Sequence, residues 1–165
     1  MIKELVVGEL DNETFAPYGA VLDPERASPK MKEDIFTFWD NLAVMNVQGN
    51  LTVALLEVYS RAREFSKLER HVRTEEVFFA LDGDVVVLVG TPTPPQAPPD
   101  PSTVRAFRLQ AGQGVFLRAG TWHWIPWPWK PRSRLLVLFR QGTPDYDLEI
   151  RDLKKEQGLS FRISV

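Results

Sequence analysis

The feature that most constrains the fold of this chain is its succession of short apolar runs separated by glycine and proline. Roughly ten to twelve such runs, rich in β-branched and aromatic residues, follow one another with little helical periodicity. The 165 residues include 10 Gly and 13 Pro. Many short strands with frequent turns are typical of a sandwich or barrel, so we expect an all-β fold, with residues 1–165 forming one domain.

Individual strands can be assigned from composition and alternation. They are expected at residues 3–7, 18–22, 36–39, 42–47, 51–59, 85–89, 103–109, 135–140 and 161–165, the last as an edge strand. Residues 85–89 are continuously apolar, which suits a strand buried on both faces. The dipeptide Asp82-Gly83 just before them predicts a hairpin turn.

Residues 91–102 contain six of the prolines and favour an extended polyproline conformation. This stretch is either a docking motif for a proline-binding partner or a stiff loop between two strands. The strand-like flanks and the short length favour the loop.

Composition excludes several functional classes. The net charge is −2 and the pI is near 5.7, so no field for nucleic acid or an anionic membrane is expected. The chain has no cysteine, which leaves histidine, carboxylates and water as ligands for any metal. The N-terminus lacks an apolar signal core and no apolar run reaches the length of a membrane span, so a cytoplasmic protein is expected.

The only two histidines lie in segments that carry other chemical groups. Glu69 and His71 are two residues apart, so both point to one face of a strand, and Glu76 follows shortly after. The other histidine, His123, lies in a segment with four tryptophans between residues 122 and 129. These tryptophans are expected mainly in the core and at the barrel mouth, with Trp122 and Trp124 on the opposite face from His123.

The spacing of these residues resembles the paired motifs of the cupin superfamily. The first block reads Glu69-x-His71-x4-Glu76-x6-Gly83, and the second reads Gly112-x5-Arg118-x-Gly120-x2-His123. Cupins have G-x5-H-x-H-x3–4-E-x6-G and G-x5-P-x-G-x2-H-x3-N at these places. The resemblance implies a cupin-type double-stranded β-helix, or jelly-roll, barrel in which both segments meet.

Over a longer stretch, the chain resembles one family within that superfamily, the ureidoglycolate lyases. The similar segments are Phe15-Ala16-Pro17-Tyr18-Gly19, Leu68-Glu69-Arg70-His71, Val77-Phe78-Phe79-Ala80-Leu81, Arg105-Ala106-Phe107, Gly112-Gln113-Gly114-Val115 and Gly120-Thr121-Trp122-His123. The resemblance implies a homodimer that acts on a small molecule, releasing urea and glyoxylate from ureidoglycolate.

Several residues depart from the family pattern close to the expected site. Glu76 replaces a glutamine, Phe116-Leu117 an Asn-Tyr pair, Trp124 a second histidine, and Ile125-Pro126 a Pro-Leu pair. Polar groups exchanged for apolar ones change which substrate a pocket can hydrogen-bond.

We expect His71, Glu76 and His123 to be the catalytic residues. His71 or Glu76 would be the base, and His123 would orient the substrate or supply the acid. Arg118, Trp124 and Phe116 are expected to contact the substrate, with Arg118 holding its carboxylate.

A divalent first-row transition metal is the expected cofactor, with Glu69, His71, Glu76 and His123 as its ligands. Two histidines and two carboxylates would balance its charge almost fully. The alternative is that the histidines are hydrogen-bonded core residues and that the glutamates pair with Arg70, Arg73 or Arg118.

Two other functions remain open at this point. One is a non-catalytic cupin that binds a small acid or sugar, which the apolar residues at positions 116 and 124 suggest. The other is a metal-dependent cupin enzyme acting on another small hydroxy acid, keto acid or sugar. Metal content and turnover would distinguish the three.

Overall fold

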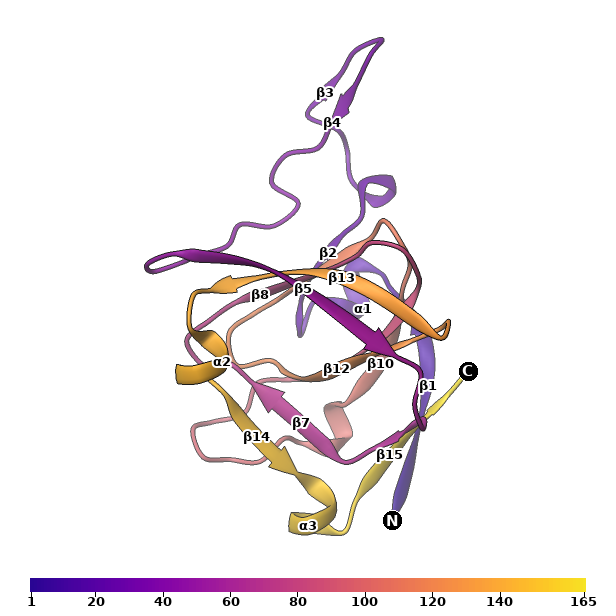
Figure 1. The fold of residues 1–165 in the computed structure, drawn as a ribbon, viewed down its shortest axis with the longest axis vertical. Helices are drawn as coiled ribbons and strands as arrows, with labels where there is room; N and C mark the ends of the chain where they lie inside the picture. The colour runs from indigo at the N-terminus through magenta and orange to yellow at the C-terminus, as the bar shows by residue number, and fades with distance from the viewer.

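The structure is a computed structural model that describes residues 1–165, and it consists of two large β-sheets that face each other (Figure 1). The eight-stranded sheet has the order β14-β7-β12-β9-β10-β1-β15-β6. Its strands are β14 (Glu149–Asp152), β7 (Lys67–Arg70), β12 (Trp122–Pro128), β9 (Val85–Gly90), β10 (Arg105–Leu109), β1 (Ile2–Glu9), β15 (Ser160–Ser164) and β6 (Glu64–Phe65).

The five-stranded sheet has the order β2-β11-β8-β13-β5. Its strands are β2 (Gly19–Leu22), β11 (Gly114–Leu117), β8 (Glu76–Ala80), β13 (Arg132–Arg140) and β5 (Leu51–Tyr59). From β7 to β14 the chain passes repeatedly between the two sheets, and this crossing is the double-stranded β-helix expected from the sequence.

Three short α-helices and two 3-10 turns complete the secondary structure. They are α1 (Asn12–Phe15), α2 (Thr143–Tyr146), α3 (Leu153–Gln157), η1 (Pro24–Arg26) and η2 (Pro101–Thr103). None of the helices is long and apolar enough to cross a membrane.

The main core lies between the two sheets. Val85, Val87 and Val89 of β9 face Phe78 of β8 and Leu135 of β13 within one buried cluster. This burial explains why the alternate positions of these strands are apolar, since each strand points every second side chain into the barrel.

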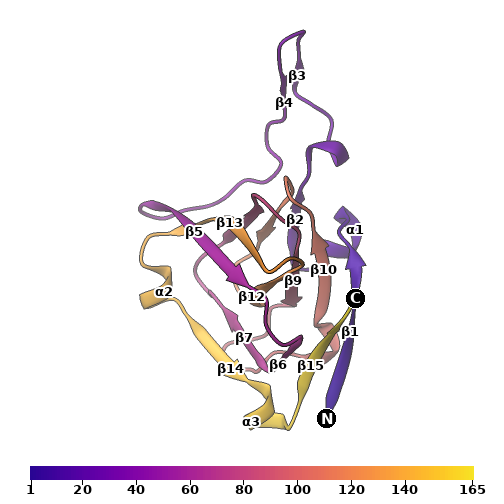
Figure 2. The ribbon, with the colours of Figure 1, turned by 45° about the vertical axis from the view of Figure 1, so that its right-hand side comes forward.

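A second core lies on the other face of the eight-stranded sheet. Val86 and Leu88 of β9 pack there with Trp122, Trp127 and Phe161. The sheet curls to enclose this core, because only Ser66 separates β6 at one end of the sheet from β7 near the other end (Figure 2). The prediction that residues 85–89 are buried on both faces is confirmed.

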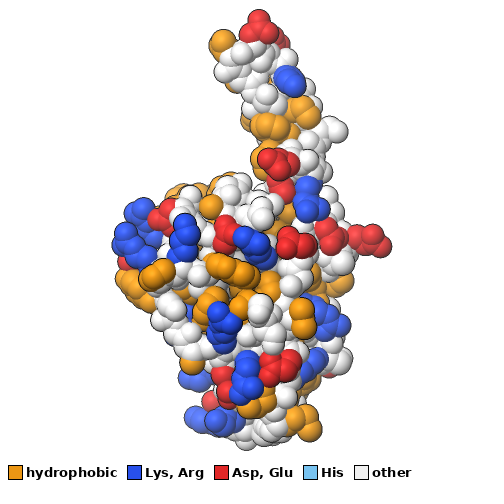
Figure 3. Space-filling view, turned by 90° about the vertical axis from the view of Figure 1, so that its right-hand side faces the viewer, with side chains coloured by type: hydrophobic (Ala, Val, Ile, Leu, Met, Phe, Trp, Pro, Cys, Tyr) orange, Lys and Arg blue, Asp and Glu red, His pale blue; other side chains and the backbone are white.

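The N-terminal third contains a projecting hairpin, β3 (Met31–Lys32) and β4 (Thr37–Phe38), which stands away from the barrel (Figures 1 and 3). The expected strand at 42–47 is wrong, because that segment has no strand pairing. It crosses the outer face of the five-stranded sheet instead, where Leu42 and Met45 contact apolar side chains.

Two further expectations need correction. Asp82-Gly83 is not a hairpin turn, because β8 and β9 on either side of it belong to different sheets. The final strand is not an edge strand, because β15 lies between β1, which it pairs in parallel, and β6.

The proline-rich segment 91–102 is tied to the barrel along its length. The guanidinium of Arg70 donates to the carbonyl oxygens of Thr93 and Pro94, and it lies 4.4 Å from the ring centroid of Trp122. The indole N–H of Trp122 donates to the hydroxyl of Thr93. These contacts favour the stiff-loop interpretation.

Candidate functional site

His71 lies immediately after β7, and its orientation is set by a distant part of the chain. Its Nδ1 lies 2.5 Å from the carbonyl oxygen of Asp147, so Nδ1 carries the proton and donates. The carboxylate of Asp147 accepts hydrogen bonds from the backbone N–H groups of Val72 and Arg73. This leaves Nε2 of His71 as the free nitrogen, with a lone pair available to a ligand.

His123 is the second residue of β12 and points into the barrel. Its Nδ1 lies 3.0 Å from the carbonyl oxygen of Thr121, which again directs Nε2 toward the interior. The two imidazole rings are 5.2 Å apart, centroid to centroid. The two histidines, 52 positions apart in sequence, therefore meet inside the barrel as expected.

Two carboxylates complete the cluster. Glu69 of β7 is paired directly opposite His123, with its Oε1 3.6 Å from His123 Nε2. Glu76 is the first residue of β8, and its Oε2 lies 3.1 Å from His123 Nε2 and 3.8 Å from His71 Nε2. Neither carboxylate forms an ion pair with an arginine, and Arg70 pairs with Glu149 instead, so the alternative interpretation of these glutamates is wrong.

The centre of the cluster contains buried polar atoms without partners. Glu76 Oε2 and His123 Nε2 are both inaccessible to solvent and have no hydrogen-bond partner, and 3.1 Å separates the two atoms. Unpaired buried polar atoms are costly unless a ligand or ion satisfies them.

Burial and charge shift the protonation of this cluster. Burial lowers the pKa of His123, but Glu76 and Glu69 raise it by more, so the pKa lies above its ordinary value. Burial raises the pKa of Glu69, and the two histidines offset only part of this effect.

The donor set fits a divalent cation. One ligand atom each from Glu69, His71 and His123 lies within 4.8 Å of the others, and Glu76 Oε2 is adjacent. Donors about 2.0–2.2 Å from one cation lie roughly 3–4 Å from one another, so small side-chain rotations would close the set. Both imidazoles are also oriented by carbonyl groups through Nδ1, which is the usual arrangement around a metal.

A cavity of about 230 Å³ opens onto this cluster between β5 and β12. Glu69 and Glu76 form its polar end, and no lysine or arginine lines it. The remaining walls are apolar and comprise Ala54, Leu55, Leu56, Phe78, Ile125, Pro126, Val137 and Phe139. The cavity thus presents carboxylates and hydrocarbon to a ligand.

Arg118 reaches the cluster from its other side. It lines a narrow space with His71, Glu76 and His123, and its guanidinium donates to the carbonyl oxygen of Ala16. Arg118 is largely exposed.

The structure does not bring Phe116 or Trp124 to this site. In β11, Phe116 pairs with Val77 and lies on the outer face of the five-stranded sheet, under segment 39–51. Trp124 lies on the face of β12 opposite to His123, against the second core. The expected alternation of Trp122 and Trp124 against His123 is confirmed, whereas a direct contact of Trp124 or Phe116 with a substrate in this cavity is wrong.

Sequence reasoning missed Asp147, whose carbonyl oxygen and carboxylate fix His71 and the two residues after it. Asp147 is buried, which is unusual for an aspartate. No spacing rule joins it to His71, because 76 residues separate them.

A double-stranded β-helix with two inward-facing histidines and two glutamates at one end of its barrel defines a cupin. Within that class, the sequence model described as "Ureidoglycolate lyase" matches residues 2–159. The chain therefore belongs to the ureidoglycolate lyase family.

Individual relatives agree with this assignment. The chain is 29% identical over 151 residues to a ureidoglycolate lyase of Brucella melitensis, covering 87% of each protein. It is 28% identical over 154 residues to one of Salmonella typhimurium, covering 88% of this chain and 93% of the other.

Solved structures give a more distant likeness. Oxalate decarboxylase of Lactobacillus farciminis, in complex with formate, superimposes with a TM-score of 0.44 at 21% identity. The matched region is 66% of this chain and spans 28% of the length of that protein.

Proposed function

We propose that this protein is a ureidoglycolate lyase, which cleaves ureidoglycolate to glyoxylate and urea. The observation that carries the proposal is the convergence of Glu69, His71, Glu76 and His123 in one cluster, whose two glutamates line the cavity. Membership of the family supports the substrate. The departures at positions 116 and 124 do not oppose it, because both side chains lie outside the cavity.

The reaction needs one proton to move. The reacting carbon of ureidoglycolate carries a hydroxyl group and a urea nitrogen. Removal of the hydroxyl proton forms the carbonyl group of glyoxylate, the carbon–nitrogen bond breaks, and the urea nitrogen takes up a proton. Glu76 suits both transfers, because its buried Oε2 has no hydrogen-bond partner and the residue lines the cavity.

The other residues would bind and orient. We propose that Glu69, His71 and His123 hold a divalent first-row cation, with Glu76 beside it or as a fourth ligand. Such a cation, when bound, would accept an oxygen of the substrate and lower the pKa of its hydroxyl group. Arg118 would hold the substrate carboxylate. In a protein without metal, His123 is the group that would supply the proton to the urea nitrogen.

The test is an assay of glyoxylate and urea release by purified protein after addition of Mn²⁺, Zn²⁺, Fe²⁺, Co²⁺ or Ni²⁺ in turn. We expect His71→Ala and Glu76→Gln each to lower kcat/KM at least about a hundredfold, since each removes a ligand or the base. Glu57→Gln is the matched control, because Glu57 pairs with Arg132 on the protein surface. If none of these metals supports turnover of ureidoglycolate, the proposed function is wrong.

Metal binding has its own readout. A cation at a hundred times its Kd raises the free energy of unfolding by about 2.7 kcal/mol, and a chelator should reverse the gain. The increase should disappear in His71→Ala and persist in Glu57→Gln. Metal-independent turnover, with no thermal shift, would favour the metal-free route through His123.

A second candidate is a metal-dependent cupin enzyme acting on another small hydroxy or keto acid. The apolar walls of the cavity favour it, because ureidoglycolate is polar at every position and gains little from Leu56, Phe78 or Phe139. Turnover of a hydroxy acid with an apolar side chain, at a higher kcat/KM than ureidoglycolate, would select this candidate. Tight binding of such an acid without chemical change would select a binding protein instead.

We also propose that the protein is a homodimer. The edge strand β5 exposes Leu51, Val53, Leu55 and Tyr59, and the projecting hairpin exposes Ile35 and other apolar side chains. Exposed strand edges and apolar sheet faces are commonly covered by a second copy. Sedimentation should give about twice the chain mass of 18.9 kDa at micromolar concentration, and a mass equal to one chain would rule the dimer out.

A further inference from the structure

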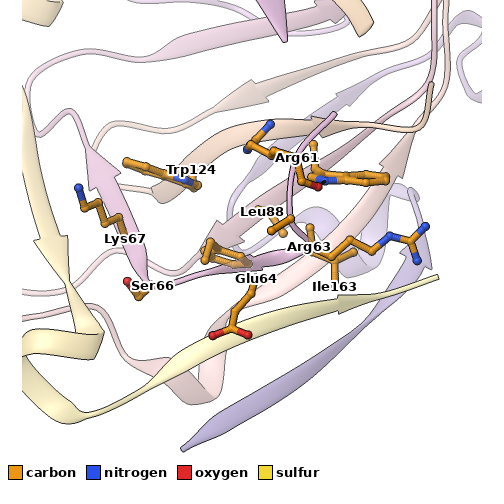
Figure 4. A pocket seen from close by; sticks show the side chains of 11 residues that line it. Arg61, Arg63, Glu64, Ser66, Lys67, Leu88, Trp124 and Ile163 are labelled. Carbon is orange, nitrogen blue, oxygen red and sulfur yellow. Dashed lines mark hydrogen bonds between the residues drawn. The ribbon is translucent and has the colours of Figure 1, made fainter. Parts of the chain in front are cut away.

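A second hollow lies behind the catalytic barrel, on the outer face of β12 (Figure 4). Its volume is about 190 Å³. Trp124 and Lys67 lie on one side of it and Arg63 and Ile163 on the other, with Leu88 between them (Figure 4). Phe65 and Trp127 complete the apolar lining.

The hollow has an excess of positive charge. Arg61, Arg63 and Lys67 line it, and none of the three has a carboxylate within 4 Å, since the ion pairs of the protein involve other residues. The one carboxylate in the lining, Glu64, points away from Trp124 and pairs with Arg162 (Figure 4).

The cation of Arg61 is fixed in place before any ligand arrives. Its guanidinium donates to the carbonyl oxygens of Tyr59, Ile125 and Pro126. Burial lowers the pKa of Arg61, and no neighbouring carboxylate offsets that cost. An anion in the hollow would offset it.

The indole of Trp124 has a free hydrogen-bond donor. The N–H groups of Trp122 and Trp127 donate to Thr93 and to the carbonyl oxygen of Arg61, whereas the N–H of Trp124 has no acceptor in the protein. Together with Phe65 and Leu88, this ring offers a flat apolar surface with a donor at its edge.

A second arginine that lies over a tryptophan ring, Arg108, differs from Arg63 because it has a carboxylate partner. Arg108 lies 4.9 Å from the ring centroid of Trp129, as Arg63 lies 5.0 Å from that of Trp127. Arg108, however, forms a salt bridge with Asp84 at 2.7 Å. Arg63, which lies over Trp127 at the hollow, has no carboxylate partner of this kind.

We propose that this hollow binds a small carboxylate with a flat apolar body, of about the size of benzoate. The ring would lie against Trp124, Phe65 and Leu88, and the carboxylate would meet either Lys67 or Arg63, which lie on opposite sides of the hollow (Figure 4). The site is separate from the catalytic cavity, because β12 lies between them: Trp124 and Trp127 line the hollow, and Ile125 and Pro126 line the cavity.

The experiment is a titration of the ¹⁵N-labelled protein with sodium benzoate, followed at the indole N–H resonance of Trp124. Trp124→Phe identifies that resonance. We expect a saturable shift with a Kd of about 1 mM, as befits a ligand of so few atoms. Benzyl alcohol, which has the ring without the charge, should bind at least about tenfold more weakly.

Three variants test the location. Arg63→Ala combined with Lys67→Ala should weaken benzoate binding at least about tenfold, and both side chains are exposed, so the fold should survive. Arg108→Ala is the matched control, and Glu76→Gln reports binding in the catalytic cavity; neither should change the Kd more than about twofold. An unresponsive Trp124, equal binding of benzyl alcohol, an unaffected double variant or a change in Kd of more than about twofold, in either direction, in Glu76→Gln would each overturn the proposal.

Discussion

The two sides of β12 offer sites of opposite charge. The inner side places His123 beside Glu69 and Glu76, which line a cavity without lysine or arginine, and the outer side places Trp124 in a hollow lined by Arg61, Arg63 and Lys67. The two sites are separated by one strand, in which the register shifts between Trp124 and Trp127, so that Ile125 and Pro126 face the cavity and both tryptophans face the hollow. The inner cavity presents carboxylates to a ligand, whereas the cations that line the outer hollow have no carboxylate partner.

The two sides also differ in what they contribute to the fold. The inner cluster keeps buried polar atoms without partners, and the outer side keeps Trp122 fully buried with its N–H bonded and Arg70 stacked on its ring. We therefore infer that the outer face of β12 stabilises the barrel and that the inner face carries the chemistry.

The largest expected effect is that of Trp122→Ala on stability. Loss of the buried ring should lower the free energy of unfolding by about 3–5 kcal/mol, measured by denaturant titration. Trp129→Ala is the matched control, because Trp129 is 40% exposed, and it should cost about 1 kcal/mol or less. Equal losses in the two variants would break the assignment of stability to the outer face.

The next effect is that of Asp147→Ala on the inner site. Asp147 is a positioning residue, and its loss would free the segment after His71 and unpair two backbone N–H groups. We expect metal affinity to fall about 10–100-fold and stability by about 1–3 kcal/mol. Competition with a fluorescent chelator measures the affinity.

Two further variants of this segment sharpen that result. Asp147→Asn retains an acceptor oxygen and should restore part of the metal affinity. Asp145→Ala changes an exposed aspartate in the same helical turn and should leave the affinity unchanged. A loss of stability in Asp147→Ala with unaltered metal affinity would show that the residue supports only the fold.

The smallest expected effect is that of the salt bridge between Arg108 and Asp84 on the pH dependence of stability. Burial raises the pKa of Asp84, but hydrogen bonds from Ala111 and Arg108 lower it by more, so its pKa lies below the ordinary value. A depressed carboxyl pKa gives stability that is present above the unfolded pKa of about 3.9 and is lost as the pH falls through the lower folded pKa.

Asp84→Asn should therefore lose less stability than the wild type on acidification from about pH 5 to pH 2, by under about 1 kcal/mol, because solvent screens the pair. Thermal unfolding over this range measures it. Identical acid dependence of the two proteins would mean that the Arg108–Asp84 pair contributes nothing to the free energy of unfolding. The comparison of paired Arg108 with unpaired Arg63 would then lose its basis.

Much of the fold followed from patterns along the chain. The continuous apolar run at residues 85–89 correctly predicted a strand buried on both faces, and alternation correctly placed Trp122 and Trp124 opposite His123. Motif spacing correctly brought His71, Glu76 and His123 together. The strand expected at residues 42–47 failed for a physical reason. Leu42 and Met45 are partly buried against the outer face of a sheet, and partial burial of that kind requires no strand partner.

The sequence by itself determined the spacing of the two histidines and two glutamates, the opposite faces of neighbouring residues in a strand, and the absence of cysteine. Only the tertiary structure decided which face of each strand points into the barrel. It places Phe116 and Trp124, which replace polar residues of the family, outside the site. It also brought Asp147 to His71 and left Arg61, Arg63 and Lys67 without anions. The physical reason is that periodicity fixes the relative direction of neighbouring side chains, whereas contacts between distant segments depend on how two sheets close around a core.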